Sequence, residues 1–346
     1  MTDAQAILAI DLSSAPKLFP GDRKAVNAKF RTLVSDWHPD HNNAPNARSV
    51  YEHVVKLRKI ALDLLSGNAA PKPSSVLASR EYVTEEGAKS RFSYLRQHSG
   101  DLGDILIGSR TVAYEIGVDY RDVAEAEILR AGSLPYADDK MRNEMKRYHP
   151  ALKRSLVLGD KTVLFYDRPA DCVLLEDLKG FLGGKIAPVH VAWIVSSLMN
   201  MVCYLDWAKL VHGAISLDTV LVCPAKHSII LVGGWGYATS SGQRPVLLPR
   251  RTTSLVPRLM VKGETVSTKV DIDLVKDIAQ DLLGAPGGTG LHFDKTIPRP
   301  LIDWTLSPSS DDAPDEYGVW TNTLNAAFGK RQFVELSVSP NSVYNT

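Results

Sequence analysis

Apolar residues recur at helical spacing through the first 65 residues of the chain. An amphipathic helix is predicted over about residues 25–37, where the apolar positions are Val26, Phe30, Leu33, Val34 and Trp37. A second pattern of this kind covers residues 46–65, and the apolar run from Ala6 to Ile10 predicts a shorter helix before both. Because strand-like alternation is missing from this stretch, we expect an all-helical region.

The pattern changes after residue 80. Short apolar, β-branched runs predict strands at 104–107, 111–116, 155–158 and 163–166, with a helix near residues 123–130 between the two pairs. A long amphipathic helix is predicted over residues 189–207, and two more strands at 220–222 and 229–232. The sequence between the two regions, SGNAAPKPSSVLAS from Ser66 to Ser79, has the composition of a linker. We therefore divide the chain into residues 1–66, a linker at 67–80, and residues 81–346.

Composition and charge limit the number of domains, the class of protein and the kind of partner that the sequence suggests. A length of 346 residues suits two domains, and 44% hydrophobic with 23% charged residues is typical of a folded globular chain. Forty basic and 39 acidic side chains leave a net charge of +1, so the overall charge favours neither a nucleic acid nor a membrane as partner.

The cysteines and the N-terminal residues give an indication of the cellular compartment. Cys172, Cys203 and Cys223 form no CxxC pair and have no nearby Cys/His ligand spacing, so neither a disulfide framework nor a zinc site is predicted. Asp3 stands where a signal peptide needs positive charge, and we see no window of about 18 apolar residues that would predict a membrane span. These features favour a cytoplasmic protein.

A tripeptide, His38-Pro39-Asp40, lies in the turn expected between the two longer N-terminal helices. Trp37 precedes it, and the helix before it carries basic residues at Arg23, Lys24, Lys29 and Arg31. With these features residues 3–66 resemble the J-domain of DnaJ-type co-chaperones. The resemblance implies that His38, Pro39 and Asp40, with the basic face of Lys24 and Arg31, bind a DnaK-type chaperone and stimulate its ATPase. The alternative is an ordinary turn beside a solvated helix face.

The basic face is incomplete relative to that family. Two positions that are usually basic hold Asn27 and Thr32, and Asp36 places a negative charge just before the tripeptide. Because charge complementarity governs steering and register between partners, the sequence predicts weaker or more selective docking.

The segment LVHGAISLDTVLV, residues 210–222, is followed by a strand and by Gly233-Gly234-Trp235-Gly236. This order resembles the catalytic loop of protein kinases, where H-R-D-L-x-x-x-N precedes a hairpin and D-F-G. Glu125 stands at the ion-pair position of the αC helix, and Asp271 at the buried anchor of αF, so the resemblance covers residues 95–335. The two regions together are similar to bacterial and phage-encoded J-domain proteins. The fold implied is α+β: an N-terminal all-α J-domain helical hairpin, then a bilobal protein-kinase-like fold.

The residues that phosphoryl transfer requires are missing from this outline. Ala214 replaces the catalytic base, Thr219 the asparagine ligand of Mg²⁺, and Gly234 the metal-binding aspartate. No lysine occurs between Lys89 and Lys140, Tyr114-Glu115 stand where the third-strand lysine would be, and we find no glycine-rich cover between Gly103 and Gly117. We therefore expect a pseudokinase without catalytic residues, metal or cofactor.

Three functions remain open on the sequence. The leading hypothesis is a cytoplasmic co-chaperone, in the host cytoplasm if phage-encoded, that recruits a DnaK-type chaperone while the kinase-like region binds an unknown client. The second is an ATP-independent interaction scaffold, cellular or virion-associated. The third is an atypical Ser/Thr kinase that uses displaced carboxylates at Asp218, Asp206 or Glu125. Arg250 and Arg251, in the region of an activation loop, would suit an acidic partner or a plain solvated loop.

Overall fold

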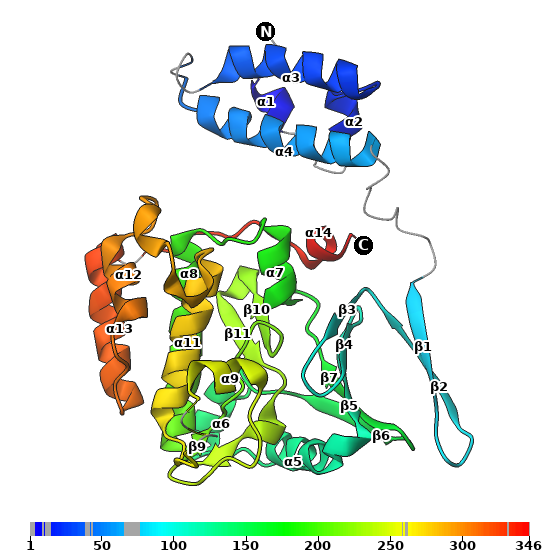
Figure 1. Cartoon of the computed structure of the whole chain (residues 1–346), viewed down its shortest axis with the longest axis vertical. Helices are drawn as coiled ribbons and strands as arrows, with labels where there is room; N and C mark the ends of the chain where they lie inside the picture. Colours follow the sequence, from blue (N-terminus) through cyan, green and yellow to red (C-terminus); the bar gives the residue numbers. More distant parts are fainter. Residues whose placement is uncertain are drawn as a thin grey trace. The chain divides into compact units, whose positions relative to one another are not determined.

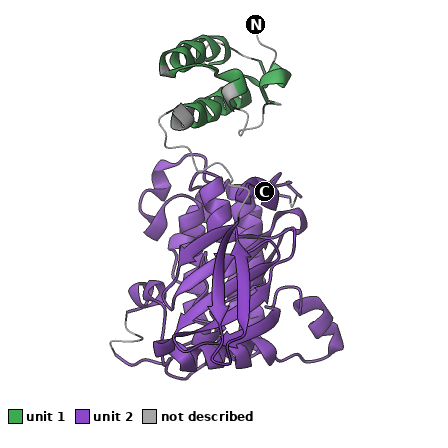
Figure 2. Ribbon diagram, turned by 90° about the vertical axis from the view of Figure 1, so that its right-hand side faces the viewer, with its two compact units in different colours: residues 1–76 green, residues 77–346 purple. Residues whose placement is uncertain are grey.

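The computed structural model describes residues 4–8, 10, 15–38, 42, 44–65, 77–257, 259, 262–330 and 332–345. The chain is of the α+β class, because it combines many helices with small antiparallel sheets (Figure 1). It divides into two compact units, residues 1–76 and 77–346, drawn in different colours in Figure 2.

The N-terminal unit is entirely helical in its described residues. The helices α3 (Arg23–Trp37) and α4 (Ala47–Leu65) match the two predicted amphipathic helices, and α1 (Ala4–Leu8) and α2 (Ala15–Leu18) pack on α4. The Asp22 side chain caps α3 by accepting a hydrogen bond from the Ala25 N–H. The apolar stripes of both long helices form one core, whose fully buried members include Val26, Leu33, Val50, Val54 and Leu57.

The second unit contains a five-stranded antiparallel sheet in the order β3-β4-β5-β7-β6. Its strands are β3 (Arg96–Ser99), β4 (Asp104–Ile107), β5 (Thr111–Gly117), β6 (Leu152–Val157) and β7 (Lys161–Asp167). The helices α5 (Arg121–Gly132) and α6 (Asp139–Met145) connect β5 to β6, and α5 packs on the sheet. The last four strands lie where the hydrophobic pattern predicted them.

A hairpin that was not predicted covers the other face of this sheet. It consists of β1 (Ala78–Val83) and β2 (Lys89–Tyr94), which alternate exposed with buried or half-buried positions. Tyr82 and Phe92 from the hairpin meet Phe165 of β7 edge-on, with ring centroids 5.9 and 5.4 Å apart. The sheet is therefore apolar on both faces, which agrees with the continuous apolar runs of β4, β5 and β7.

The rest of the unit is mainly helical. Its elements are α7 (Leu175–Phe181), α8 (Pro188–Trp207), α9 (Arg250–Leu255), α11 (Thr268–Leu282), α12 (Arg299–Leu306), α13 (Ala313–Phe328) and α14 (Pro340–Tyr344). Short strands β8 (Val173–Leu174), β10 (Val220–Cys223) and β11 (Ser228–Leu231) form one sheet, and β9 (Leu210–Val211) pairs with β12 (Thr239–Ser240). Figure 1 shows α8, α11, α12 and α13 on the side of β10 and β11 away from the five-stranded sheet, whereas α14 lies toward the sheet.

The helix α8 forms the centre of this helical part and packs against α11 and α13. Within the described residues it is the one helix that is long and apolar enough to cross a membrane, judged by length and composition alone. One helix of this kind is weak evidence for a membrane span, and the expectation that the sequence holds none stays a prediction. Just over half of its apolar window, 56%, is buried within the protein, so packing against α11 and α13 also accounts for its apolar composition.

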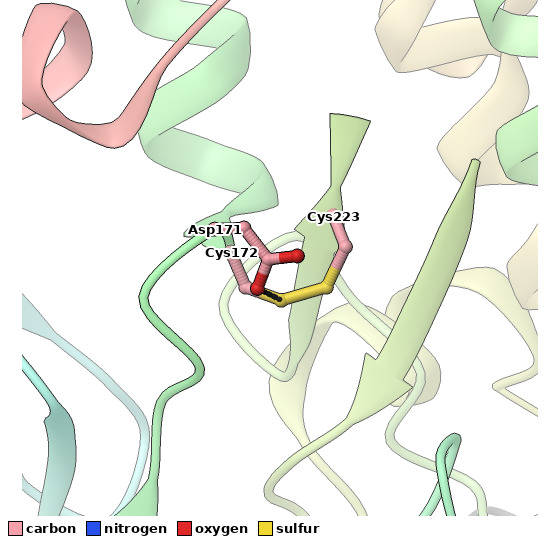
Figure 3. Close-up of side chains that lie close together, drawn as sticks. All are labelled: Asp171, Cys172 and Cys223. Atoms are coloured by element: carbon pink, nitrogen blue, oxygen red, sulfur yellow. Dashed lines mark hydrogen bonds between the residues drawn. A yellow bond between two sulfur atoms is a disulfide. The ribbon is translucent and has the colours of Figure 1, made fainter. Parts of the chain in front are cut away.

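A single segment, residues 168–172, leads from β7 into the helical part. The buried Arg168 guanidinium donates hydrogen bonds to the carbonyl oxygens of Gly108, Ser109 and Cys172, and so ties this segment to the turn between β4 and β5. A disulfide between Cys172 and Cys223 fastens the same segment to the end of β10 (Figure 3).

The disulfide corrects the expectation that these cysteines stay unpaired. In the β8–β10 pairing Val173 lies opposite Val222, so the next residues outward, Cys172 and Cys223, face each other. The two cysteines are 51 positions apart in the chain, and their spacing carries no sign of the strand pairing that brings them together.

Reduction of this disulfide is expected to lower the free energy of unfolding of the second unit by about 2–4 kcal/mol, because the cross-link restricts the unfolded chain. Urea unfolding with and without dithiothreitol, with thiols counted by mass spectrometry, measures the change. Cys203→Ser, which removes the free cysteine, should unfold like the wild type. An unchanged midpoint after complete reduction would contradict the prediction.

Candidate functional site

In the N-terminal unit the residues assigned to chaperone binding are only partly described. Pro39 and Asp40 lie outside the described residues, as does the side chain of Arg23. His38 ends α3: its backbone N–H binds the Val34 carbonyl, and its half-buried ring meets Tyr51 edge-on at 5.1 Å.

The basic residues of α3 do not all share one face. Lys24, Lys29 and Arg31 are exposed. Lys24 and Arg31 are seven residues apart, two turns of the helix, and therefore project to the same side, whereas Lys29 points elsewhere. Asn27, on the same side as Lys24, accepts hydrogen bonds from Arg58 of α4 at 2.8 and 3.2 Å, so this departure from the basic pattern joins the two helices.

In the second unit a cavity of about 400 Å³ lies between the five-stranded sheet and the helical part. Its wall comes from the β3–β4 loop, the end of β5, one residue each of α5 and α7, residues 214–219, Gly234, Tyr237 and the start of α9. This is where the kinase resemblance places the degenerate positions.

Three of the four degenerate positions meet in this cavity. A Cβ atom on Gly234 would lie 3.0 Å from the Ala214 Cβ and 3.3 Å from the Thr219 Cγ2, so the three residues are in direct contact. The Thr219 hydroxyl donates to the Ala214 carbonyl at 2.9 Å and accepts from the Ser216 N–H at 3.0 Å, and it is thereby committed to the loop. At this point the site offers a methyl group, a loop hydroxyl and a glycine, and no carboxylate to hold a metal.

The fourth position, Glu125, lies elsewhere. It is exposed on α5, whereas Glu127 is 4% exposed and lines the cavity. The Glu127 carboxylate accepts hydrogen bonds from the Tyr166 hydroxyl at 3.0 Å and the Gly236 N–H at 2.5 Å, and burial raises its pKa. Two residues along a helix turn the side chain by about 200°, so Glu127 rather than Glu125 faces the cavity.

Tyr114 of β5 extends into the space where the third-strand lysine was expected. Its hydroxyl donates to the Asp218 carbonyl at 2.9 Å, across from β5 to the loop below. A Cβ on Gly233 would lie 2.5 Å from the Tyr114 ring, so the phenol occupies the room that a side chain at residue 233 would need. Tyr114 thus joins the two walls of the cavity.

A loop that lies over the cavity contains two glycines, Gly100 and Gly103. Residues 100–103 connect β3 to β4, and Gly103 adopts φ +150°, where a Cβ would meet the Glu115 carbonyl at 2.2 Å. A glycine-rich cover was considered from the sequence only between Gly103 and Gly117, and its absence there stays a prediction. The loop also carries Asp101, which accepts a hydrogen bond from the Arg250 N–H at 2.7 Å.

Beneath the cavity, residues 212–214 are held by α11. The buried Asp271 accepts hydrogen bonds from the N–H groups of His212 and Gly213, both at 2.8 Å, as the anchoring role predicted. Burial raises the pKa of Asp271 to about 7, although the two N–H donors act in the opposite sense. Burial also lowers the pKa of His212 to about 3, so its ring is neutral, and it packs edge-on against Trp235 at 4.8 Å.

The basic residues at the start of α9 have specific partners. Arg251 forms ion pairs with Asp277 at 2.5 Å and Asp281 at 3.2 Å, both on α11, and Arg250 lies 3.4 Å from Asp101. The Thr252 hydroxyl donates to the Gly213 carbonyl at 2.6 Å. These contacts fasten α9 against the loop of residues 212–214.

Among the described residues, one group of three side chains has potential metal ligands close together: Asp171, Cys172 and Cys223 (Figure 3). The disulfide occupies both sulfur atoms, and Asp171 forms an ion pair with Lys226 at 2.7 Å. In this form the group lacks the thiolates that a metal such as zinc would need.

No protein-family model matches this chain, and no curated protein sequence matches it. The functional conclusions therefore depend on the geometry of the two units.

Proposed function

We propose that the protein is a co-chaperone whose N-terminal J-domain stimulates a DnaK-type ATPase, and whose second unit is a kinase-like domain without phosphotransfer activity. The observation that carries the proposal is the position of His38 at the end of α3, beside a face that exposes Lys24 and Arg31. A chaperone that binds His38 and the basic face together would meet both on one helix, α3.

The arrangement of the second unit supports the kinase-like interpretation. The helix α5 follows the third strand of the five-stranded sheet, as αC follows the third strand in protein kinases. Asp271 holds the residues at the catalytic-loop position by their backbone, and Trp235 packs on His212 as part of the same assembly. In this interpretation the five-stranded sheet is the smaller lobe and α8 with α11 forms the core of the larger one.

The same geometry argues against the atypical kinase. Phosphoryl transfer needs carboxylates and a lysine at the phosphates, and the three displaced acids do not replace them. Asp206 is bound to the Thr268 hydroxyl at 2.9 Å, and Glu125 is exposed on α5. Asp218 lines the cavity, but Ala214 and Gly234, at the positions of the catalytic base and the D-F-G aspartate, have no carboxylate.

The co-chaperone proposal is tested with the full-length protein and a purified DnaK-type ATPase under single-turnover conditions. The wild type is expected to accelerate ATP hydrolysis, and His38→Gln to return the rate to that of the chaperone alone. His292→Gln, the same substitution at an exposed site of the second unit, should behave as the wild type. Equal rates for the wild type and His38→Gln would overturn the proposal.

The ATP-independent scaffold is the second candidate, because Asn27 is engaged with Arg58 and leaves a reduced basic face on α3. It predicts that partners captured from the cytoplasm by the full chain stay bound when ATP and a DnaK-type chaperone are added. Release of the partner under those conditions would favour the co-chaperone.

A further inference from the structure

The cavity of the second unit has an excess of negative charge. Its charged lining residues, apart from the His98 imidazole, are one guanidinium and five carboxylates: Arg251, Asp101, Glu115, Glu127, Glu176 and Asp218. The guanidinium is already bound to Asp277 and Asp281, so it adds no free positive charge to the wall.

Three of the carboxylates already have ion-pair or hydrogen-bond partners within the protein. Glu115 forms ion pairs with Arg80 and Lys161, Asp101 is held by Arg250, and Glu127 accepts its two hydrogen bonds from Tyr166 and Gly236.

The remaining two, Asp218 and Glu176, retain acceptor capacity. The Asp218 carboxylate receives a hydrogen bond from the Ser216 hydroxyl, and the Glu176 carboxylate forms no ion pair or side-chain hydrogen bond with the described part of the chain. Both line the cavity, and the Glu176 N–H donates to the carbonyl of Leu217, the neighbour of Asp218, at 3.0 Å, so the two residues lie at the same end of the cavity.

The wall also contains a polar side chain, Tyr237, that can contribute a hydrogen bond to a ligand. Tyr237 is only 8% exposed, and its hydroxyl has no hydrogen-bond partner among the described residues. Burial is the largest cause that raises the pKa of this hydroxyl, and the negative charges of Asp101, Glu127 and Asp218 raise it further. Tyr237 lines the cavity together with these three acids. A hydroxyl in a cavity wall can donate or accept a hydrogen bond, so Tyr237 can contribute a contact to a group bound there.

We propose that this cavity binds an alkylammonium group, carried either by a polyamine or by a lysine side chain of a peptide. An ammonium has three donors, which match the carboxylates of Asp218 and Glu176 and the hydroxyl oxygen of Tyr237. A metal-free triphosphate would meet like charge at these carboxylates, and Arg251 is not free to offset it. This inference goes beyond the co-chaperone function and does not depend on His38.

Calorimetric titration of the full-length protein with spermidine tests the site, beside parallel titrations with a lysine-containing tripeptide, its acetyl-lysine form and Mg-ATP. We expect saturable heat with spermidine or the lysine peptide, none with the acetylated peptide, and binding that weakens as salt increases. Spermidine alone would identify a polyamine site, and the lysine peptide a peptide site. Absence of saturable heat from both amines, or tighter binding of Mg-ATP, would overturn the proposal.

Single variants distinguish binding at this cavity from nonspecific attraction between an amine and the acidic surface. Asp218→Asn and Tyr237→Phe each remove one contact with little change in volume, and each should weaken binding, the former by about tenfold, which corresponds to one lost charge-assisted hydrogen bond. Asp139→Asn, an exposed acid on α6, should bind as the wild type. Equal affinity of Asp218→Asn and the wild type, with matching circular dichroism spectra, would contradict the site.

Discussion

Asp271→Ala is expected to lower the free energy of unfolding of the second unit by about 3–5 kcal/mol, because it leaves two buried N–H groups without an acceptor. These groups belong to His212 and Gly213, and each lies 2.8 Å from an Asp271 oxygen. Substitution also opens a void beside α11, where the side chain is 1% exposed. Urea unfolding followed by tryptophan fluorescence measures the loss, since Trp235 packs directly on His212.

The matched control is Asp273→Ala, two residues along the same helix and half-buried. It removes an aspartate from α11 without touching the backbone of residues 212–213, so it should cost much less. Equal losses for the two variants would show that Asp271 contributes through helix stability rather than through its two hydrogen bonds.

A pH series on Asp271→Asn gives a second measure of the same interaction. In the folded protein the pKa of Asp271 is raised to about 7, whereas in the unfolded chain it is near 4. The folded state therefore holds this proton more tightly, and the contribution to stability is complete below pH 4 and lost as the pH rises through 7. The difference in unfolding free energy, wild type minus Asp271→Asn, should fall as the pH rises from about 4 to about 7. Because His212 is common to both proteins, its own titration largely cancels.

The hydrophobic pattern predicted the strands and helices that bury a continuous apolar face, such as β4, β5, α5 and α8. It did not predict the β1–β2 hairpin, whose residues alternate Arg, Glu, Lys and Ser with a few aromatics. That hairpin exists because Tyr82 and Phe92 cover Phe165 on a sheet face that would otherwise be exposed. Tertiary packing, which a single segment does not encode, decided its conformation.

Motif spacing located the cavity but not every residue in it. Ala214, Thr219 and Gly234 come together because strand pairing and loop length fix their positions. Glu127 was missed because a helix face depends on the exact register, and two residues of error select the opposite side. The Asp101-bearing loop was missed because β3 holds only four residues and has no apolar alternation.

Tyr114 and the two glycines opposite it explain how the cavity differs from a phosphate site. The phenol spans from β5 to the Asp218 carbonyl, and Gly233 and Gly234 leave room for the phenol and for the ring of His212. Aromatic packing thus occupies positions where the kinase resemblance predicts a lysine and a metal ligand. The acids that remain around this packing give the cavity its affinity for positive rather than negative charge.

Gly236→Ala is expected to destabilise the second unit by at least about 3 kcal/mol, because the added methyl group has nowhere to go. Its Cβ would lie 2.4 Å from the Val123 carbonyl oxygen and 2.7 Å from the Val123 Cγ1. Since the closer contact is a backbone atom of α5, a side-chain rotation cannot relieve it, and the turn of residues 235–237 must move away from the helix. That movement also pulls the Gly236 N–H away from Glu127, which leaves a buried carboxylate with one donor fewer.

Gly132→Ala provides the control within α5 itself. A Cβ at this exposed residue meets nothing within 4 Å, so the substitution should leave stability unchanged or raise it by about 0.4–1 kcal/mol through the unfolded state. Both variants are compared by urea unfolding, with near-ultraviolet circular dichroism to follow the packing of Trp235. If Gly236→Ala unfolded at the same urea concentration as Gly132→Ala, the close packing of α5 on residues 235–237 would be disproved. The wall of the cavity would then have to be built differently, because Glu127 reaches it through this contact.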